Sequence, residues 1–194
     1  MNSQPDTHSQ LVLFVASKVL RHAHDLTCAA HREHLCFAAW IDMLCEGAIN
    51  TPPEQVARAD YQEASAAREQ THAILSQTIT SATTFLLVEL PRAIPSLVGP
   101  AHSSSPDAAP SVLLYLPYLE QEMEALDAAT HRRHSAFTAW LQELADGMDR
   151  PPEIAARATY QEAAAARDTA LHSLRQAILA LTLFIQRNPQ LGTA

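Results

Sequence analysis

Histidines spaced one helical turn apart are the residues of this sequence whose spacing best suits metal chemistry. They occur twice, as His31 with His34 and as His131 with His134. Imidazole pairs on the helices of a bundle can hold iron, zinc or copper. The pattern predicts a transition-metal site near the middle of a helical bundle, and it makes a metal-dependent oxidase or oxygenase one functional alternative.

A second candidate metal site combines His24, Cys28 and His72. His24 and Cys28 lie one turn apart on the same expected helix. We expect His72 to lie close to Cys28 on the partner helix. The equivalent positions in the second half of the chain hold other residues, so this site would occur only once. Those residues are Glu124, Ala128 and Leu171.

A third candidate is a binding site for a small acidic ligand. Its residues are Tyr61, Arg68, Arg133, Tyr160 and Arg167. Partly buried guanidiniums need a counter-charge, which either surface carboxylates or a ligand can supply. The tyrosine hydroxyls would add hydrogen-bond donors. The arginines also disfavour a bare cation in the same layer, because they would repel it.

An internal repeat predicts how these residues are positioned. Residues 31–47 and 131–147 are identical at eight of 17 positions, and residues 52–68 and 151–167 at 13 of 17. The numerical offset changes from 100 to 99 between the two blocks, which a turn can absorb. Identity of this extent indicates a tandem duplication.

Each half of the chain predicts a helix, a turn and a second helix. The first helices cover about residues 10–46 and 111–146, without a break at 29–31 or 129–131. Glycines at 47 and 147 end them, and double prolines at 52–53 and 151–152 open helices that run to about 89 and 186. The expected fold is an all-α four-helix bundle built from two tandem-duplicated long helical hairpins.

The same pattern divides the chain into segments. We expect a disordered N-terminus at 1–9, a first hairpin at 10–90, a proline- and serine-rich linker at 91–110 and a second hairpin at 111–188. Both hairpins are expected to pack as one domain. The linker length does not decide between a simple end loop and a crossover connection.

An antiparallel hairpin that turns near residue 50 pairs residues whose numbers sum to about 101. Trp40 is then expected beside Tyr61, and Glu33 and His34 beside Arg68. The corresponding polar level of the second half brings Arg133 and His134 to Arg167. The aromatic and polar layers should therefore be neighbours in each hairpin.

Two glutamates, Glu63 and Glu162, lie roughly opposite the tyrosine-bearing face of their helices. Together with the glutamines that precede them, they are expected to face solvent or a second molecule. That molecule would be a partner helix or a second copy of the chain in a homodimer.

Composition excludes several classes of function. A net charge of -8 disfavours a nucleic-acid binder, and the apolar stretch 11–20 is too short for a membrane span. Three cysteines make no disulfide framework, which predicts reduced thiols and a cytoplasmic protein. With 4 glycines the chain has no glycine-rich phosphate loop, and no serine or cysteine stands in a recognisable nucleophilic pattern.

The sequence therefore predicts a cytoplasmic protein that acts by binding. Its ligand would be a partner protein or a small acidic molecule held in the mid-bundle histidine, arginine and tyrosine layer. The alternative is a bundle that binds iron, zinc or copper. No reaction or substrate is indicated.

Overall fold

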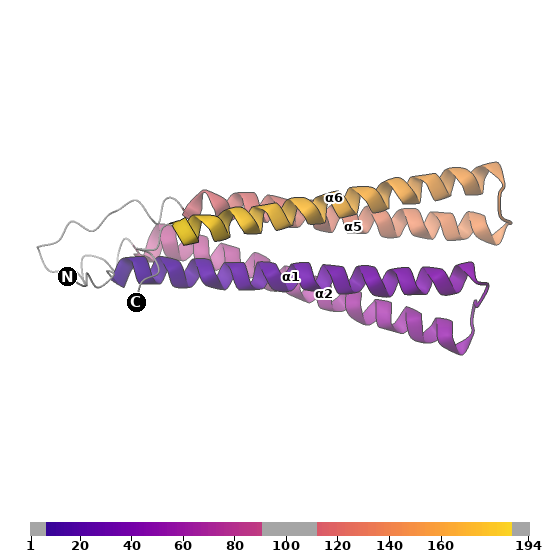
Figure 1. The fold of residues 1–194 in the computed structure, drawn as a ribbon, viewed down its shortest axis with the longest axis horizontal. Helices are drawn as coiled ribbons and strands as arrows, with labels where there is room; N and C mark the ends of the chain where they lie inside the picture. Colours follow the sequence, from indigo (N-terminus) through magenta and orange to yellow (C-terminus); the bar gives the residue numbers. More distant parts are fainter. Residues whose placement is uncertain (1–6, 91–111, 188–194) are drawn as a thin grey trace, which may run out of the picture. The chain divides into compact units, whose positions relative to one another are not determined.

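The chain is all-α in the computed structural model, which describes residues 7–90 and 112–187. Helix α1 spans Thr7–Cys45, and α2 spans Pro52–Thr84 and continues into a short π-helix, η1, at Phe85–Glu89. Helix α5 spans Tyr115–Ala145, and α6 spans Pro151–Arg187. α1 and α2 form hairpin 1, and α5 and α6 form hairpin 2 (Figure 1). The expected fold class is confirmed, because four long helices form two hairpins.

The helix boundaries agree closely with those expected from the sequence. α1 and α5 run without interruption through residues 29–31 and 129–131, as predicted. α1 begins at Thr7, inside the segment expected to be disordered, and the rest of that segment lies outside the described residues. The expected linker at 91–110 also lies outside them.

Buried residues follow a seven-residue repeat along α1 and α5. Their spacing alternates between four and three, which keeps one face of a slightly supercoiled helix turned to its neighbours. On α1 the repeat comprises Val12, Ala16, Val19, Ala23, Leu26, Ala30, Glu33 and Phe37, and Thr27 is buried beside it. On α5 the repeat comprises Leu116, Leu119, Met123, Leu126, Thr130, Arg133, Phe137 and Trp140, and Ala129 is buried beside it. Glu33 and Arg133 therefore occupy core positions of the repeat.

Glycine ends the first helix of each hairpin. Gly47 has a φ of 76° and Gly147 a φ of 126°, a region that residues with a Cβ rarely adopt. Thr51 then caps α2, since its Oγ accepts a hydrogen bond from the Glu54 amide at 3.5 Å. Residues 46–51 connect α1 to α2, whereas residues 146–150 connect α5 to α6. The first turn is therefore one residue longer than the second, as the change of the repeat offset from 100 to 99 predicts.

The π-helix η1 keeps the apolar side chains at the end of α2 turned toward the core. Ala82, Leu86 and Leu90 are all buried, and each is four residues from the next. In an α-helix of 3.6 residues per turn, successive steps of four would rotate the apolar face away from the core. The Leu90 amide instead donates to the Phe85 carbonyl, five residues back, and this wider turn keeps the leucines facing inward.

The chain divides into two compact units that do not coincide with the hairpins. Unit 1 contains Met1–Leu116 and Ile178–Ala194, and unit 2 contains Pro117–Ala177. Unit 1 therefore holds all of hairpin 1 together with the outer ends of α5 and α6. The expectation that both repeats pack as one domain stays a prediction.

Equivalent positions in the core of unit 1 carry apolar side chains of different size. Ala16 of α1 corresponds to Leu116 of α5, and Ala82 of α2 corresponds to Leu181 of α6; all four are buried. A close-packed core accepts a larger residue at one position when a smaller one stands at another. The outer ends of the two halves therefore share the apolar character of these buried positions but not the size of the side chains there.

Candidate functional site

An aromatic layer lies near the turn of hairpin 1. The rings of Trp40 and Tyr61 stack with centroids 5.4 Å apart and planes 17° from parallel. Phe37 packs against Tyr61 at 5.0 Å and against Trp40 at 6.3 Å. The predicted neighbourhood of Trp40 and Tyr61 is confirmed. Tyr61, which the sequence suggested as a hydrogen-bond donor to a small acidic ligand, is therefore part of a packed aromatic cluster.

Hairpin 2 repeats this layer with nearly the same geometry. Trp140 and Tyr160 stack at 5.3 Å with planes 17° apart, and Phe137 lies 5.7 Å from Tyr160. Stacked and edge-on aromatic pairs stabilise a fold by about 0.5–1.5 kcal/mol beyond the area they bury. The layer thus joins the first and second helices of each hairpin.

A buried carboxylate hydrogen-bonds the tryptophan in both layers. Trp40 Nε1 donates to Glu54 Oε1 at 2.7 Å, and Trp140 Nε1 donates to Glu153 Oε1 at 2.7 Å. Glu54 is 2% exposed and Glu153 is 1% exposed. These glutamates were not among the residues singled out from the sequence. The sequence nevertheless contains an indication of their role, because each directly follows the double proline in the block of the repeat with the highest identity.

Two further features stabilise these buried carboxylates. Both lie in the first turn of their helices, where the backbone N–H groups and the helix dipole favour negative charge. Each glutamate is also followed, four residues later in the helix, by an arginine. Arg58 Nε lies 3.8 Å from Glu54, and Arg157 Nη2 lies 3.5 Å from Glu153. The arrangement suits a structural clamp between helices.

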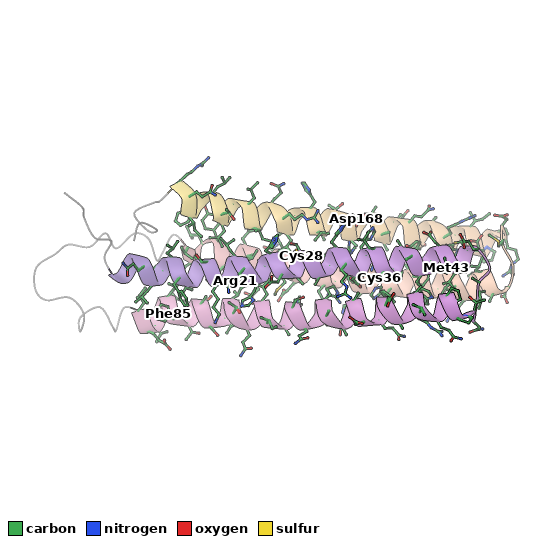
Figure 2. All side chains as sticks on the ribbon, turned by 60° about the horizontal axis from the view of Figure 1, so that its bottom comes forward. Arg21, Cys28, Cys36, Met43, Phe85 and Asp168 are labelled. Atoms are coloured by element: carbon green, nitrogen blue, oxygen red, sulfur yellow. The ribbon has the colours of Figure 1, made fainter. Side chains whose placement is uncertain are left out.

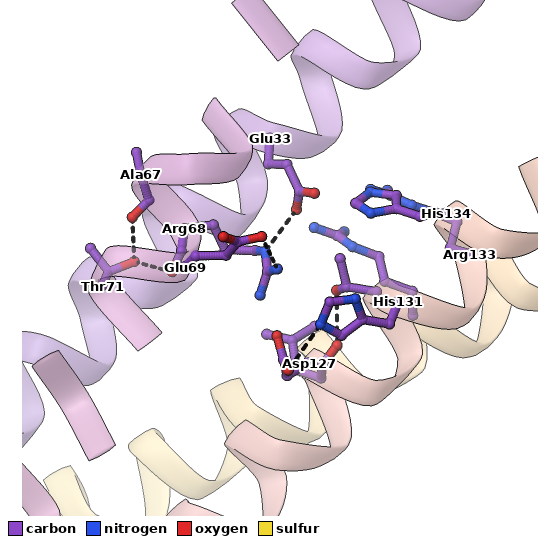
Figure 3. Close-up of polar contacts among 12 residues, drawn as sticks. Glu33, Ala67, Arg68, Glu69, Thr71, Asp127, His131, Arg133 and His134 are labelled. Atoms are coloured by element: carbon purple, nitrogen blue, oxygen red, sulfur yellow. Dashed lines mark hydrogen bonds and ion pairs between the residues drawn. The ribbon is translucent and has the colours of Figure 1, made fainter. Parts of the chain in front are cut away.

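The polar layer of hairpin 1 is an internal ion pair. Arg68 Nε lies 3.4 Å from Glu33 Oε2, and the side chains are 1% and 0% exposed (Figure 3). Arg68 Nη2 also lies 3.8 Å from the exposed carboxylate of Glu69. The predicted pairing of Glu33 with Arg68 is confirmed. An acidic ligand is therefore not required to balance the charge of Arg68.

Hairpin 2 differs at this level, because Arg133 replaces the glutamate. Arg133 and Arg167 are each 1% exposed. Arg167 Nη1 lies 3.2 Å from Asp168 Oδ1, and Arg133 Nη2 lies 3.2 Å from His134 Nε2. Of the predicted ligand residues, the two tyrosines thus lie in the aromatic layers. Arg68 and Arg167 lie two turns away from them along α2 and α6, and Arg133 lies on α5.

The candidate metal ligands are spread over several environments. His31 and His131 are exposed, whereas His34 and His134 are partly buried. His131 Nε2 lies 3.4 Å from Asp127 Oδ2 (Figure 3). Within residues 7–90 and 112–187, no three histidine, cysteine, aspartate or glutamate side chains come together in a way that could hold a metal ion. The metal hypothesis stays a prediction without support from this geometry.

The second metal candidate is reduced to one pair. His24 Nε2 and Cys28 Sγ lie 3.6 Å apart on the exposed side of α1, while His72 is partly buried on α2. All three cysteines of the chain are free thiols on α1, and Cys28 and Cys36 can be followed along it in Figure 2. A thiol beside one imidazole is an incomplete donor set for zinc or copper.

A surface of identical residues occurs on both hairpins. In hairpin 1, Arg32 Nη2 lies 3.2 Å from Glu63 Oε1, with side chains 61% and 71% exposed. Ala39 and Ala67 continue the same sides of α1 and α2. We call this surface the Arg–Glu face. It comprises Arg32, Ala39, Glu63 and Ala67 in hairpin 1, and Arg132, Ala139, Glu162 and Ala166 in hairpin 2.

Comparison of the chain with models of protein families, with curated proteins and with solved structures gave no match. Among the helices described here, none combines the length and the apolar character that crossing a membrane requires. The interpretation of the site therefore depends on its geometry.

We expect Glu54→Ala to destabilise hairpin 1 by about 1.5–3 kcal/mol, because the partly buried Trp40 indole N–H loses its charged acceptor. Glu153→Ala should have a similar effect in hairpin 2. Chemical denaturation measures the loss, and fluorescence reports it locally because the chain has only 2 tryptophans. Glu54→Gln, which retains an acceptor oxygen, is the matched control. Unchanged stability and emission in both alanine variants would show that the hydrogen bond has no structural role.

Arg68→Met should cost about 3–5 kcal/mol, because it leaves Glu33 buried without its ion-pair partner in hairpin 1. The control is Glu69→Gln, which removes only an exposed partner of the same arginine and should change stability by less than about 0.5 kcal/mol. Denaturant titration of both variants separates the two effects. A loss below about 1 kcal/mol for Arg68→Met would contradict a structural role for the pair and favour a ligand.

Proposed function

We propose that this protein acts by binding a helical protein partner through the Arg–Glu face. The observation that carries the proposal is that this face is identical in the two hairpins and that all its residues except the partly buried Ala67 are exposed. Nearby exposed positions have diverged, as Leu35 against Ser135 and Asp60 against Thr159 illustrate. Packing of the core does not account for identity at exposed charged positions, whereas binding of a partner does.

The chemistry of the face suits a helix. Ala39 and Ala67 have small side chains, which allow a partner backbone to approach closely. Arg32 and Glu63 place one positive and one negative charge beside them, which would fix the orientation of the partner. A face that occurs twice would also let one chain engage two sites, and this raises the effective affinity without new contacts.

The small acidic ligand and the metal are the less favoured alternatives. Glu33 already balances Arg68 in hairpin 1, which weakens the case for an acidic ligand there. The metal alternative lacks a group of three donors within the described part of the chain. We further propose that the two hairpins arose by tandem duplication and that the protein works in the cytoplasm, where its three free thiols would stay reduced.

Photo-crosslinking in the native host tests the partner-binding proposal. A photoreactive amino acid at Ala39 or at Ala139 should give specific protein adducts, because both positions lie on the Arg–Glu face. The reversals Glu63→Arg and Glu162→Arg should each suppress the adduct of the hairpin that carries them. Mass spectrometry of the adducts measures the outcome.

Matched controls are the equivalent positions Ala73 and His172, which are exposed but differ between the hairpins. The proposal is wrong if Ala39 and Ala139 give no more adduct than these positions. Adducts from one hairpin alone would reject the idea of a face that functions twice.

A further inference from the structure

Exposed apolar side chains extend the Arg–Glu face of hairpin 1 along α2. Val56 is 60% exposed and Ile74 is 38% exposed. They lie seven residues before and eleven residues after Glu63. Since these spacings are close to whole turns of an α-helix, both side chains lie on the side of α2 that carries Glu63. Together with Ala67 they form an apolar stripe about five helical turns long.

Carboxylates border this stripe on both helices of the hairpin. On α2, Asp60 and Glu63 are exposed. Asp25 and Glu46 are also exposed, seven residues before and fourteen residues after Arg32, which places them on the side of α1 that carries Arg32. Among the described residues of hairpin 1, four exposed carboxylates and one exposed guanidinium thus surround the stripe. The surface around the apolar stripe is therefore acidic.

Hairpin 2 lacks both additions to the Arg–Glu face. The residues equivalent to Asp25, Val56, Asp60 and Ile74 are, in that order, Ala125, Ala155, Thr159 and Ser173. The two apolar side chains are thus replaced by a smaller or a polar one, and two of the carboxylates by uncharged side chains. Hairpin 1 therefore presents more apolar area and more negative charge beside the same face.

We propose that the Arg–Glu face of hairpin 1 binds a basic amphipathic helix that lies along α2. This inference rests on the proposed function and names the chemistry of the partner. Apolar side chains that recur every seven or eleven residues on the partner would meet Val56, Ala67 and Ile74. Lysines or arginines beside them would face the carboxylates, and this charge complementarity selects against acidic helices. Hairpin 2 holds the same helix more weakly.

Two synthetic peptides, each about five helical turns long, test the inference on the full-length chain. Both carry leucines at spacings of seven and eleven residues, flanked by lysines in one peptide and by glutamates in the other. Calorimetric titration should show one tight site for the lysine peptide and a second site at least about tenfold weaker. The glutamate peptide should bind the chain at least about tenfold more weakly than the lysine peptide.

Substitutions on α2 locate the tight site. Val56→Ala with Ile74→Ser copies hairpin 2 and should raise the Kd of the tight site about tenfold, because less apolar area is buried. The matched control is Leu35→Ser, which removes a comparably exposed side chain from α1, outside the stripe. It should change this Kd less than about twofold. Circular dichroism checks that each variant keeps its helices.

The converse substitutions should create a second tight site. Ala155→Val, Thr159→Asp and Ser173→Ile together give hairpin 2 the stripe of hairpin 1. The inference is overturned if this variant keeps one tight site, if the tight site survives Val56→Ala with Ile74→Ser, or if the lysine peptide binds no better than the glutamate peptide. These outcomes do not decide the proposed function, because the adducts formed in the host do not depend on the peptides.

Discussion

Each hairpin buries a carboxylate at the start of its second helix, and a tryptophan N–H on its first helix makes this burial tolerable. An unsatisfied carboxylate in such a place would cost several kcal/mol. The bond to Trp40 or Trp140, at 2.7 Å in both cases, fixes how the two helices meet beyond the turn. Stacking of the tyrosine on the indole then follows, because the indole plane is already set.

This constraint explains where the two hairpins resemble each other. Residues near the turn must keep the tryptophan, the glutamate after the double proline and the tyrosine together, and these are identical in both. The polar layer farther along is less constrained, since Glu33 in one hairpin corresponds to Arg133 in the other. At the outer ends only the apolar pattern is kept, and equivalent buried positions carry side chains of different size, such as Ala16 and Leu116.

Periodicity and the position of the turn were sufficient to predict the helices, the proximity of Trp40 to Tyr61 and the pairing of Glu33 with Arg68. Glu54 and Glu153 escaped prediction, because an acidic residue in a first helical turn usually faces solvent. Only the turn geometry directs these side chains back to the preceding helix. The π-turn at Phe85–Glu89 was also missed, since it depends on the core positions of Leu86 and Leu90. The histidine spacing indicated ligands, yet His31 and His131 are exposed and belong to no group of three donors among the described residues.

The most direct test of this account is hydrogen exchange at the two indole N–H groups, followed by NMR of the chain labelled at tryptophan. A donor held by a buried carboxylate exchanges only when the surrounding structure opens. Both indole protons of the wild-type chain should therefore exchange at least about a hundredfold more slowly than a free indole. Exchange at the free rate for either Trp40 or Trp140 would contradict the claim that a hydrogen bond from tryptophan to a buried carboxylate holds each hairpin together.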